Sequence, residues 1–241
     1  MTDQPLHVVI LAAGEGKRMN SGLPKVLQPV AGRPMLEHLV RAALALQPAG
    51  LHVVVGHEAE QVRSLLASID AAAIDSVEQR RRLGTGHAVE QAMASIPDSA
   101  RVLVLPGDMP LVRPDTLSRF RDLESDLGVL TFVADDPFGY GRILRDQQQR
   151  VIGIREQRDA TPAEAGVREV NSGVLAADAG RLRGWLERLE NSNSQGEYYL
   201  TDCVALAVGD GVAVEALISE DPDELLEIGR ASCRERVFPV V

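Results

Sequence analysis

Glycines and cations cluster near the start of the chain, directly after a run of apolar residues. The apolar run His7–Leu11 predicts a buried first strand, small residues follow at 12–16, and the cations Arg18 and Lys25 come next. Backbone N–H groups of a glycine-rich turn, together with Arg and Lys, are the groups that bind a polyphosphate. The segment is no Walker A loop, and Met19 replaces the third glycine of a dinucleotide fingerprint. We therefore expect phosphate binding here, with an ordinary turn as the alternative.

A carboxylate follows the second strong apolar run. Arg101–Leu105 predicts a buried strand, and Asp108 comes three residues after it. In an open parallel sheet, ligands bind beyond the carboxyl ends of the strands, so Asp108 is expected to face the same site as the first loop. A carboxylate beside a phosphate site suits a divalent cation. The alternative is that Asp108 only caps a turn.

Other polar turns are candidates for the rest of the site. Gly84–His87 opens a predicted helix whose N–H groups could bind a base edge or an anion, or form a plain helix start. Gly139–Arg142, Glu156 and Asn171–Gly173 are expected at the ends of short strands, where they would contact sugar hydroxyls or form ordinary turns. Arg80–Arg82 is typical of a solvated surface.

Alternating strands and helices are expected to position these residues. Helices are predicted at 34–46, 58–69, 87–96, 115–123, 182–189 and 200–208, and further strands at 51–56, 74–79, 129–134 and 212–217. Continuous apolar runs separated by helices predict a mostly parallel sheet with helices on both faces. Short strands at 142–144 and 151–154 predict an inserted small β region rather than a second domain. The expected fold class is therefore α/β, with a Rossmann-like mixed sheet.

Composition excludes several classes of protein. The 241 residues are 45% hydrophobic with a net charge of -10, which argues against a nucleic-acid surface, since that needs clustered cations. Cys203 and Cys233 form neither a disulfide framework nor a metal-binding spacing, so we expect a reducing, cytoplasmic setting. No signal peptide is recognisable, and no apolar run approaches the roughly 20 residues that cross a bilayer.

The motifs, taken in order, resemble one enzyme family. They are LAAGEGKRM, LPKVL, GTGHA, GDMPL, GYGRI, EQRDAT, EVNSGVL and QGEYYLTD. From about residue 6 to about residue 220 the chain is similar to the uridylyltransferase domain of the bacterial bifunctional N-acetylglucosamine-1-phosphate uridyltransferase/glucosamine-1-phosphate acetyltransferases. The first two motifs are shared by sugar nucleotidyltransferases in general, whereas GTGHA, EVNSG and QGEYYLTD are more specific. The resemblance implies a nucleotidyltransferase fold and synthesis of UDP-N-acetylglucosamine and pyrophosphate from UTP and N-acetylglucosamine 1-phosphate.

The resemblance also implies a role for each matching residue. Arg18 and Lys25 would act as catalytic residues on the nucleotide phosphates, and Asp108 would bind Mg²⁺. The other implied substrate-binding residues are Leu11, Ala12, Ala13 and Gly14 along the nucleotide, Gln79, Gly84 and Thr85 at the uracil, Pro106 and Gly107 beside Asp108, and Gly141, Glu156 and Asn171 at the N-acetylglucosamine.

The chain departs from the family at its C-terminal end. We expect the uridylyltransferase domain to span residues 1–226 and residues 227–241 to be a tail foreign to the family. The family has an Asn here that is its second protein ligand to the metal, and Glu227–Arg230 lacks it. The tail can be written codon for codon as a translated sequencing adapter, and a divergent native terminus is the alternative.

The family then continues into a left-handed β-helix that carries the acetyltransferase and forms a trimer, and no such sequence follows here. We therefore expect a monomer without acetyltransferase activity. Two other functions stay open: a UDP-sugar-binding fragment impaired in catalysis, and a nucleotidyltransferase for another sugar phosphate.

Overall fold

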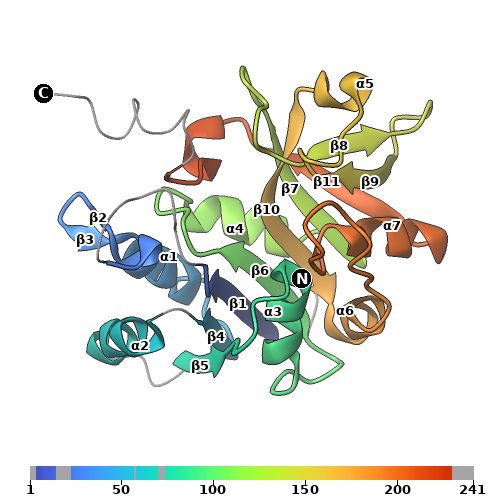
Figure 1. Cartoon of the computed structure of the whole chain (residues 1–241). Helices are drawn as coiled ribbons and strands as arrows, with labels where there is room; N and C mark the ends of the chain where they lie inside the picture. Colours follow the sequence, from blue (N-terminus) through green and yellow to red (C-terminus); the bar gives the residue numbers. More distant parts are fainter. Residues whose placement is uncertain (1–3, 15–22, 57, 70–73, 230–241) are drawn as a thin grey trace, which may run out of the picture.

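The computed structural model describes residues 4–14, 23–56, 58–69 and 74–229. A nine-stranded mixed sheet lies at the centre of this part of the molecule (Figure 1). Its main strands are β1 (Leu6–Ala12), β4 (Gly50–Val55), β5 (Ile74–Glu78), β6 (Arg101–Pro106), β7 (Leu127–Val133), β10 (Glu169–Asp178) and β11 (Val214–Ile218). Their order is β11-β7-β10-β6-β1-β4-β5. β1, β4, β5 and β6 are parallel, as are β7 and β11, whereas β10 is antiparallel to its neighbours. The predicted mostly parallel mixed sheet is confirmed.

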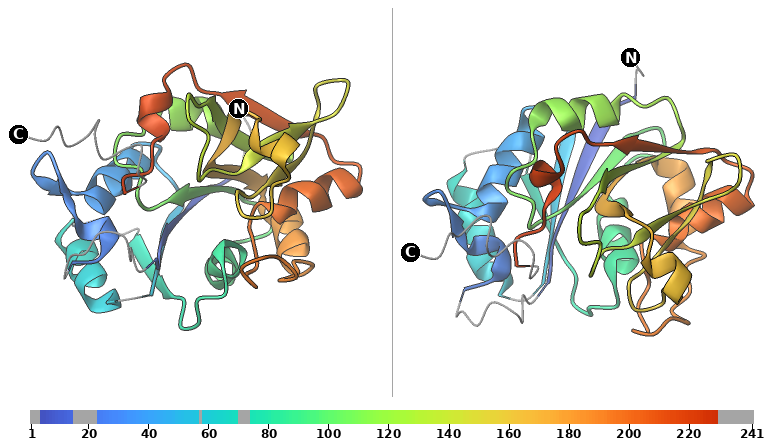
Figure 2. Two further views of the ribbon diagram at one scale, coloured as in Figure 1. Left: turned by 45° about the horizontal axis from the view of Figure 1, so that its top comes forward. Right: turned by 90° about the horizontal axis from the view of Figure 1, so that it is seen from above.

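Helices cover both faces of the sheet, as predicted (Figure 2). They are α1 (Met35–Leu44), α2 (Ala59–Ser68), α3 (Thr85–Met93), α4 (Pro114–Arg121), α5 (Pro162–Ala165), α6 (Ala179–Leu186) and α7 (Asp202–Gly209). Val8 and Ile10 of β1 pack in one core with α1, α2 and α4, while Val9 packs in a second core with α3, α6 and α7. Alternation along a strand therefore supplies both cores from one apolar run. In the described ranges we find no helix long and apolar enough to cross a membrane.

The predicted inserted β region is a hairpin of β8 (Arg142–Arg145) and β9 (Val151–Arg155). β8 joins the main sheet by pairing with β10 at Val170 (Figure 1). The hairpin therefore extends one end of the central sheet instead of forming a separate core.

The long strand β10 corrects one expectation. The sequence predicts Asn171–Gly173 at the ends of short strands, but these residues lie inside β10, where Asn171 still pairs with Thr131 of β7 and Ser172 and Gly173 follow it within the irregular stretch. The register shifts between Asn171 and Leu175, and Gly173 has a φ of 83°. Ser172 interrupts the apolar pattern, and its buried Oγ donates to Leu130 O of the neighbouring strand β7 at 2.7 Å. A bulge of this kind re-aims a side chain within a strand.

A buried carboxylate fastens the last described segment to helix α4. Glu224 lies in the 3-10 helix η3 (Pro222–Leu225) and is 4% exposed. It accepts hydrogen bonds from Thr116 Oγ1 at 2.9 Å, from Ser219 Oγ at 2.9 Å and from Arg113 N at 3.2 Å. Buried carboxylates are tolerated when they are hydrogen-bonded in this way.

We predict that Glu224→Ala lowers the free energy of unfolding by about 2–3 kcal/mol, because it leaves several donors without their buried acceptor. Urea denaturation measures this loss. Glu220→Ala, at an exposed position of the same segment, is the matched control and should stay within about 0.5 kcal/mol of wild type. Equal effects of the two substitutions would contradict this role of Glu224.

Two histidines stack near the amino ends of the parallel strands β1 and β4. His7 and His52 lie on neighbouring strands with ring centroids 5.4 Å apart, and His7 Nδ1 is 3.0 Å from His52 Nε2. Burial lowers the pKa of both rings, although Asp75 opposes the effect at His52. One ring nitrogen must accept while the other donates, so the geometry suits neutral rings.

Stability should therefore fall as the pH drops below about 6.5, where the unfolded chain binds protons that the folded pair resists. Wild type is expected to lose more unfolding free energy between about pH 7.5 and about pH 5.5 than His7→Gln, measured by urea denaturation. His38→Gln, at a histidine outside the pair, controls for loss of a ring. Identical pH profiles of wild type and His7→Gln would exclude the pair as the cause.

Candidate active site

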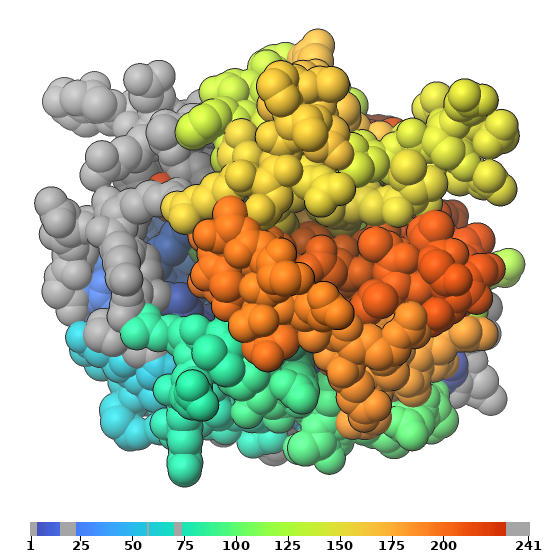
Figure 3. Space-filling view, turned by 45° about the vertical axis from the view of Figure 1, so that its right-hand side comes forward, coloured from blue at the N-terminus to red at the C-terminus, as the bar shows by residue number. Residues whose placement is uncertain are grey.

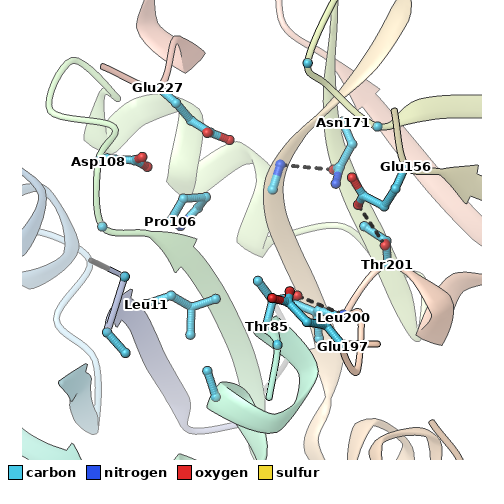
Figure 4. A pocket seen from close by; sticks show the side chains of 18 of the residues that line it. Leu11, Thr85, Pro106, Asp108, Glu156, Asn171, Glu197, Leu200, Thr201 and Glu227 are labelled. Atoms are coloured by element: carbon cyan, nitrogen blue, oxygen red, sulfur yellow. Dashed lines mark hydrogen bonds between the residues drawn. The ribbon is translucent and has the colours of Figure 1, made fainter. Parts of the chain in front are cut away.

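A large cavity opens beyond the carboxyl ends of β1 and β6. Its volume is about 1470 Å³, and segments distant in sequence line it. Figure 3 shows the orange segment near residue 195 between the green residues of the α3 region and the yellow residues of the β9–α5 region. Figure 4 shows side chains from these segments pointing into one space. This is the position at which ligands bind in open α/β sheets.

The turn after β6 lies directly on the end of β1. Gly107 N donates to Leu11 O at 2.9 Å, and a Cβ at position 107 would lie only 2.6 Å from that oxygen. A side chain at position 107 would therefore separate the two strand ends. The contact places Asp108 beside the end of β1, from which the first loop starts.

Lys25 and Asp108 form an ion pair at this end of the cavity. Lys25 begins the 3-10 helix η2 (Lys25–Leu27), and its Nζ donates to Asp108 Oδ2. Both side chains are mostly buried, with 21% and 15% exposed. The chain leading out of η3 crosses the same place, where Ile228 N donates to Asp108 O at 3.0 Å. The structure thus brings the predicted catalytic cation and the predicted metal ligand together, while Arg18 lies outside the described residues.

A second wall of the cavity comes from the segment between β5 and α3 and from the start of α3. Gln79 Nε2 donates to Gly84 O at 3.0 Å and lies 3.0 Å from His87 Nδ1. These contacts fix the orientation of a side chain that is only 4% exposed. Thr85 Oγ1 accepts from Leu200 N at 3.0 Å, so the start of α3 also holds the segment before α7. Gln79, Gly84 and Thr85, all predicted at the uracil, therefore share one wall.

The third wall carries the residues predicted at the sugar. Asn171 N donates to Gly141 O at 2.8 Å, which joins β10 to the turn before β8. The carbonyl Oδ1 of Asn171 accepts from Gly173 N at 3.1 Å, so its amide NH₂ end is the end left to donate. Glu156 Oε1 accepts from Thr201 Oγ1 at 3.0 Å (Figure 4). A carboxylate, an amide and a hydroxyl together can bind the hydroxyl groups of a sugar.

Most of the predicted site residues line this one cavity. They are Leu11, Ala13, Gly14, Lys25, Gln79, Gly84, Thr85, Pro106, Gly107, Asp108, Gly141, Glu156 and Asn171. The side chain of Ala12 instead packs in the core, because neighbouring residues of a strand point to opposite faces. Arg80 and Arg82, expected on a solvated surface, are exposed and line the cavity.

Sequence reasoning assigned no role to two further lining residues, Thr201 and Glu197. Both lie in the segment 195–202, which runs between the second and third walls. The sequence feature that points to this segment is the density of polar and aromatic residues in the motif QGEYYLTD. The neighbouring Tyr199 packs beside it with its hydroxyl accepting from Gln195 Nε2 at 2.7 Å, and burial raises the pKa of the phenol, which keeps it neutral.

The described residues contain no group of three or more His, Cys, Asp or Glu side chains that could hold a metal ion. A cation at this end of the cavity would therefore have only one or two carboxylates from the described part of the chain, of which Asp108 is one. This suits Mg²⁺, which retains several waters and binds through one or two carboxylates together with substrate phosphates. Figure 4 shows Glu227 at the same end of the cavity as Asp108.

Residues 8–193 match the MobA-like NTP transferase domain family. The chain belongs to this family. Among solved structures, a Bacillus anthracis protein described as a glucose-1-phosphate thymidylyltransferase, in complex with sucrose, has the same fold. It superposes with a TM-score of 0.77 at 20% identity, covering 96% of this chain and 93% of the other.

Curated relatives are considerably more similar in sequence. The chain is 52% identical to the bifunctional protein GlmU of Alkalilimnicola ehrlichii over 98% of its own length and 51% of that protein. It is 51% identical to GlmU of Stenotrophomonas maltophilia, over 97% of this chain and 53% of the other. The corresponding values for Pseudomonas putida GlmU are 50%, 96% and 50%. The chain thus spans about half the length of the curated relatives it matches, and it resembles their nucleotidyltransferase half.

We predict that Gly107→Ala disturbs the site, because the added Cβ would be forced against Leu11 O. Overpacking of this kind lowers the free energy of unfolding by about 1–3 kcal/mol. Thermal unfolding of the two variants measures the loss. Gly153→Ala is the control, because no atom lies within 4 Å of its added Cβ. If Gly107→Ala behaved like this control, the close contact would not support the site.

Proposed function

We propose that the chain transfers a uridylyl group from UTP to N-acetylglucosamine 1-phosphate, giving UDP-N-acetylglucosamine and pyrophosphate. One observation carries the proposal: a single cavity is lined both by the residues expected at a nucleotide and by those expected at a sugar. The 50–52% identity to proteins named GlmU supports it. The nucleotidyltransferase family supplies the class of reaction.

The nucleotide would lie along the second wall and reach the Lys25–Asp108 end of the cavity. Gly14 follows β1 and lines the cavity, and Lys25 lines it as well. Backbone N–H groups and a cation there can hold phosphate oxygens. Gln79 and the start of α3 would bind the edge of the base, since both present amide groups of fixed orientation. In this arrangement the α-phosphate of UTP would lie between the second wall, which holds the uracil, and the third wall, which holds the sugar.

The sugar would lie against the third wall. Glu156, Asn171 and Thr201 offer acceptors and donors for its hydroxyls, and Gly141 lets the backbone approach closely. Its phosphate would then face the α-phosphate of UTP. Holding two substrates in a reactive orientation can contribute roughly 7–11 kcal/mol of the barrier reduction.

The residues present suit this chemistry. A sugar phosphate oxygen attacks the α-phosphorus of UTP, the bond to the bridging oxygen breaks, and pyrophosphate leaves. The nucleophile is already an anion, so no general base is needed. The protein must reduce the repulsion between the two anions and stabilise the charge that grows on the leaving group. We propose Lys25, whose ammonium group lies at the charged end of the cavity, for that task, and Arg18 to share it.

Asp108 is the residue we propose to bind Mg²⁺ together with the phosphates. When bound, the cation would neutralise phosphate charge. Lys25 would then move from Asp108 to the phosphates, because both compete for the same carboxylate oxygen. We propose further that the domain works in the cytoplasm and binds neither nucleic acid nor membranes.

Pyrophosphate release by the purified 241-residue chain tests the function. The reaction contains UTP, N-acetylglucosamine 1-phosphate and Mg²⁺, with glucose 1-phosphate and CTP as substituted controls. Release that requires both the acetylated sugar and UTP is expected. Release only with glucose 1-phosphate, or only with CTP, would contradict the proposal and indicate another nucleotidyltransferase activity. A chain that binds UDP-N-acetylglucosamine but releases no pyrophosphate would be a binding protein, and the proposed transfer would be wrong.

Lys25→Ala is predicted to lower turnover at least tenfold with the fold intact, because it removes a cation from the developing charge. Steady-state pyrophosphate release measures turnover, and circular dichroism checks the fold. Arg33→Ala removes an exposed cation of β3 (Arg33–Pro34) that does not line the cavity, and it should leave turnover unchanged. Unchanged turnover in Lys25→Ala would remove Lys25 from the mechanism.

A further inference from the structure

The side chain of Phe138 is unusually exposed for an aromatic residue. It is 72% exposed, whereas other exposed large apolar side chains of the described ranges, such as Leu23 and Ile152, reach 47% and 42%. Phe138 also lines the cavity. An apolar ring left in water at the edge of a binding cavity gains contact free energy when a ligand covers it.

Hydrogen bonds hold the turn that carries this ring. Phe138 N donates to Asp136 Oδ1 at 3.0 Å, and Gly139 N donates to Gln157 Oε1 at 2.9 Å. The same Gln157 oxygen accepts from Arg142 Nη2 at 2.8 Å, and the Arg142 side chain is buried. The ring is thus mounted on a fixed turn, so that little ordering is required when a ligand binds.

The next residue anchors the turn in the core. Tyr140 is 1% exposed, and its ring meets that of Phe132 edge to face with centroids 5.2 Å apart. Arg142 Nη1 also donates to Tyr140 O. The turn therefore stays attached to β7 and β8 while the Phe138 ring projects from it.

The position of the turn identifies the part of the ligand that Phe138 would meet. The turn continues directly into Gly141, and its anchor Gln157 follows Glu156. Both Gly141 and Glu156 belong to the third wall, whereas the Lys25–Asp108 pair lies at the ends of β1 and β6. A hexopyranose presents hydroxyls at its edge and C–H groups on its faces. The polar groups of the third wall suit the hydroxyls, and an aromatic ring suits the C–H faces.

We propose that Phe138 packs against the apolar face of the bound hexose and raises the affinity for the sugar part of the ligand. This inference rests on the proposed function, because it assumes that the cavity holds a UDP-sugar. Phe138 is then a residue that distinguishes a sugar-bearing ligand from the bare nucleotide.

Calorimetric titration with two ligands, UDP and UDP-N-acetylglucosamine, tests the assignment. Phe138→Ala should weaken UDP-N-acetylglucosamine binding about tenfold, roughly 1.4 kcal/mol, and change UDP binding less than about twofold. Phe138→Tyr keeps a ring and should restore the affinity to within about threefold of wild type. Ile152→Ala is the matched control, because Ile152 is an exposed apolar residue of β9 that does not line the cavity.

The alternative outcomes are distinct. Equal weakening of both ligands by Phe138→Ala would place the ring at the nucleotide and overturn the sugar contact. Unchanged affinity for both ligands would make Phe138 an ordinary surface residue, while wild-type binding and pyrophosphate release would leave the proposed function standing. A wild-type chain that binds neither ligand would refute the proposed function and this inference with it.

Discussion

The close approach of the turn after β6 to the end of β1 is the constraint on which the site depends. Gly107 N donates to Leu11 O, and no side chain fits between the two strand ends. Because β1 and β6 are parallel neighbours, their carboxyl ends open at the same edge of the sheet. The contact brings Asp108 to the end of β1, and Lys25 completes the charged end of the cavity. Without this approach, Asp108 would not lie beside the end of β1.

The antiparallel strand β10 gives the cavity its second half. It lies between β6 and β7 and carries Asn171 at its bulge, next to Gly141 of the turn before β8. A parallel sheet alone would place loops from one direction only at this edge. The segment before α7 then joins the two halves, since Thr85 Oγ1 accepts from Leu200 N on one side and Glu156 accepts from Thr201 on the other. Residues from both halves thus line one cavity.

Much of this was accessible from the sequence. The apolar runs of β1 and β6 fixed the centre of the sheet, and their following loops predicted where Lys25 and Asp108 would meet. The sequence does not predict the strand β10, because Asn171 and Ser172 interrupt its apolar pattern. The groups to which these two residues hydrogen-bond lie elsewhere in the chain. The Ala12 side chain packs in the core because side chains alternate between the two faces along β1. The motif LAAGEGKRM does not indicate this alternation. The link from Thr85 to residue 200 crosses more than a hundred positions, and no local pattern encodes it.

A crystal structure of the chain with UDP-N-acetylglucosamine and Mg²⁺ tests the central claim most directly. We expect the uracil beside Gln79 and Gly84, the metal on Asp108, and the sugar between Glu156 and Asn171. Such a complex would place both ligand halves in the cavity beyond β1 and β6. A sugar bound away from Glu156 and Asn171, or a nucleotide outside this cavity, would contradict the account.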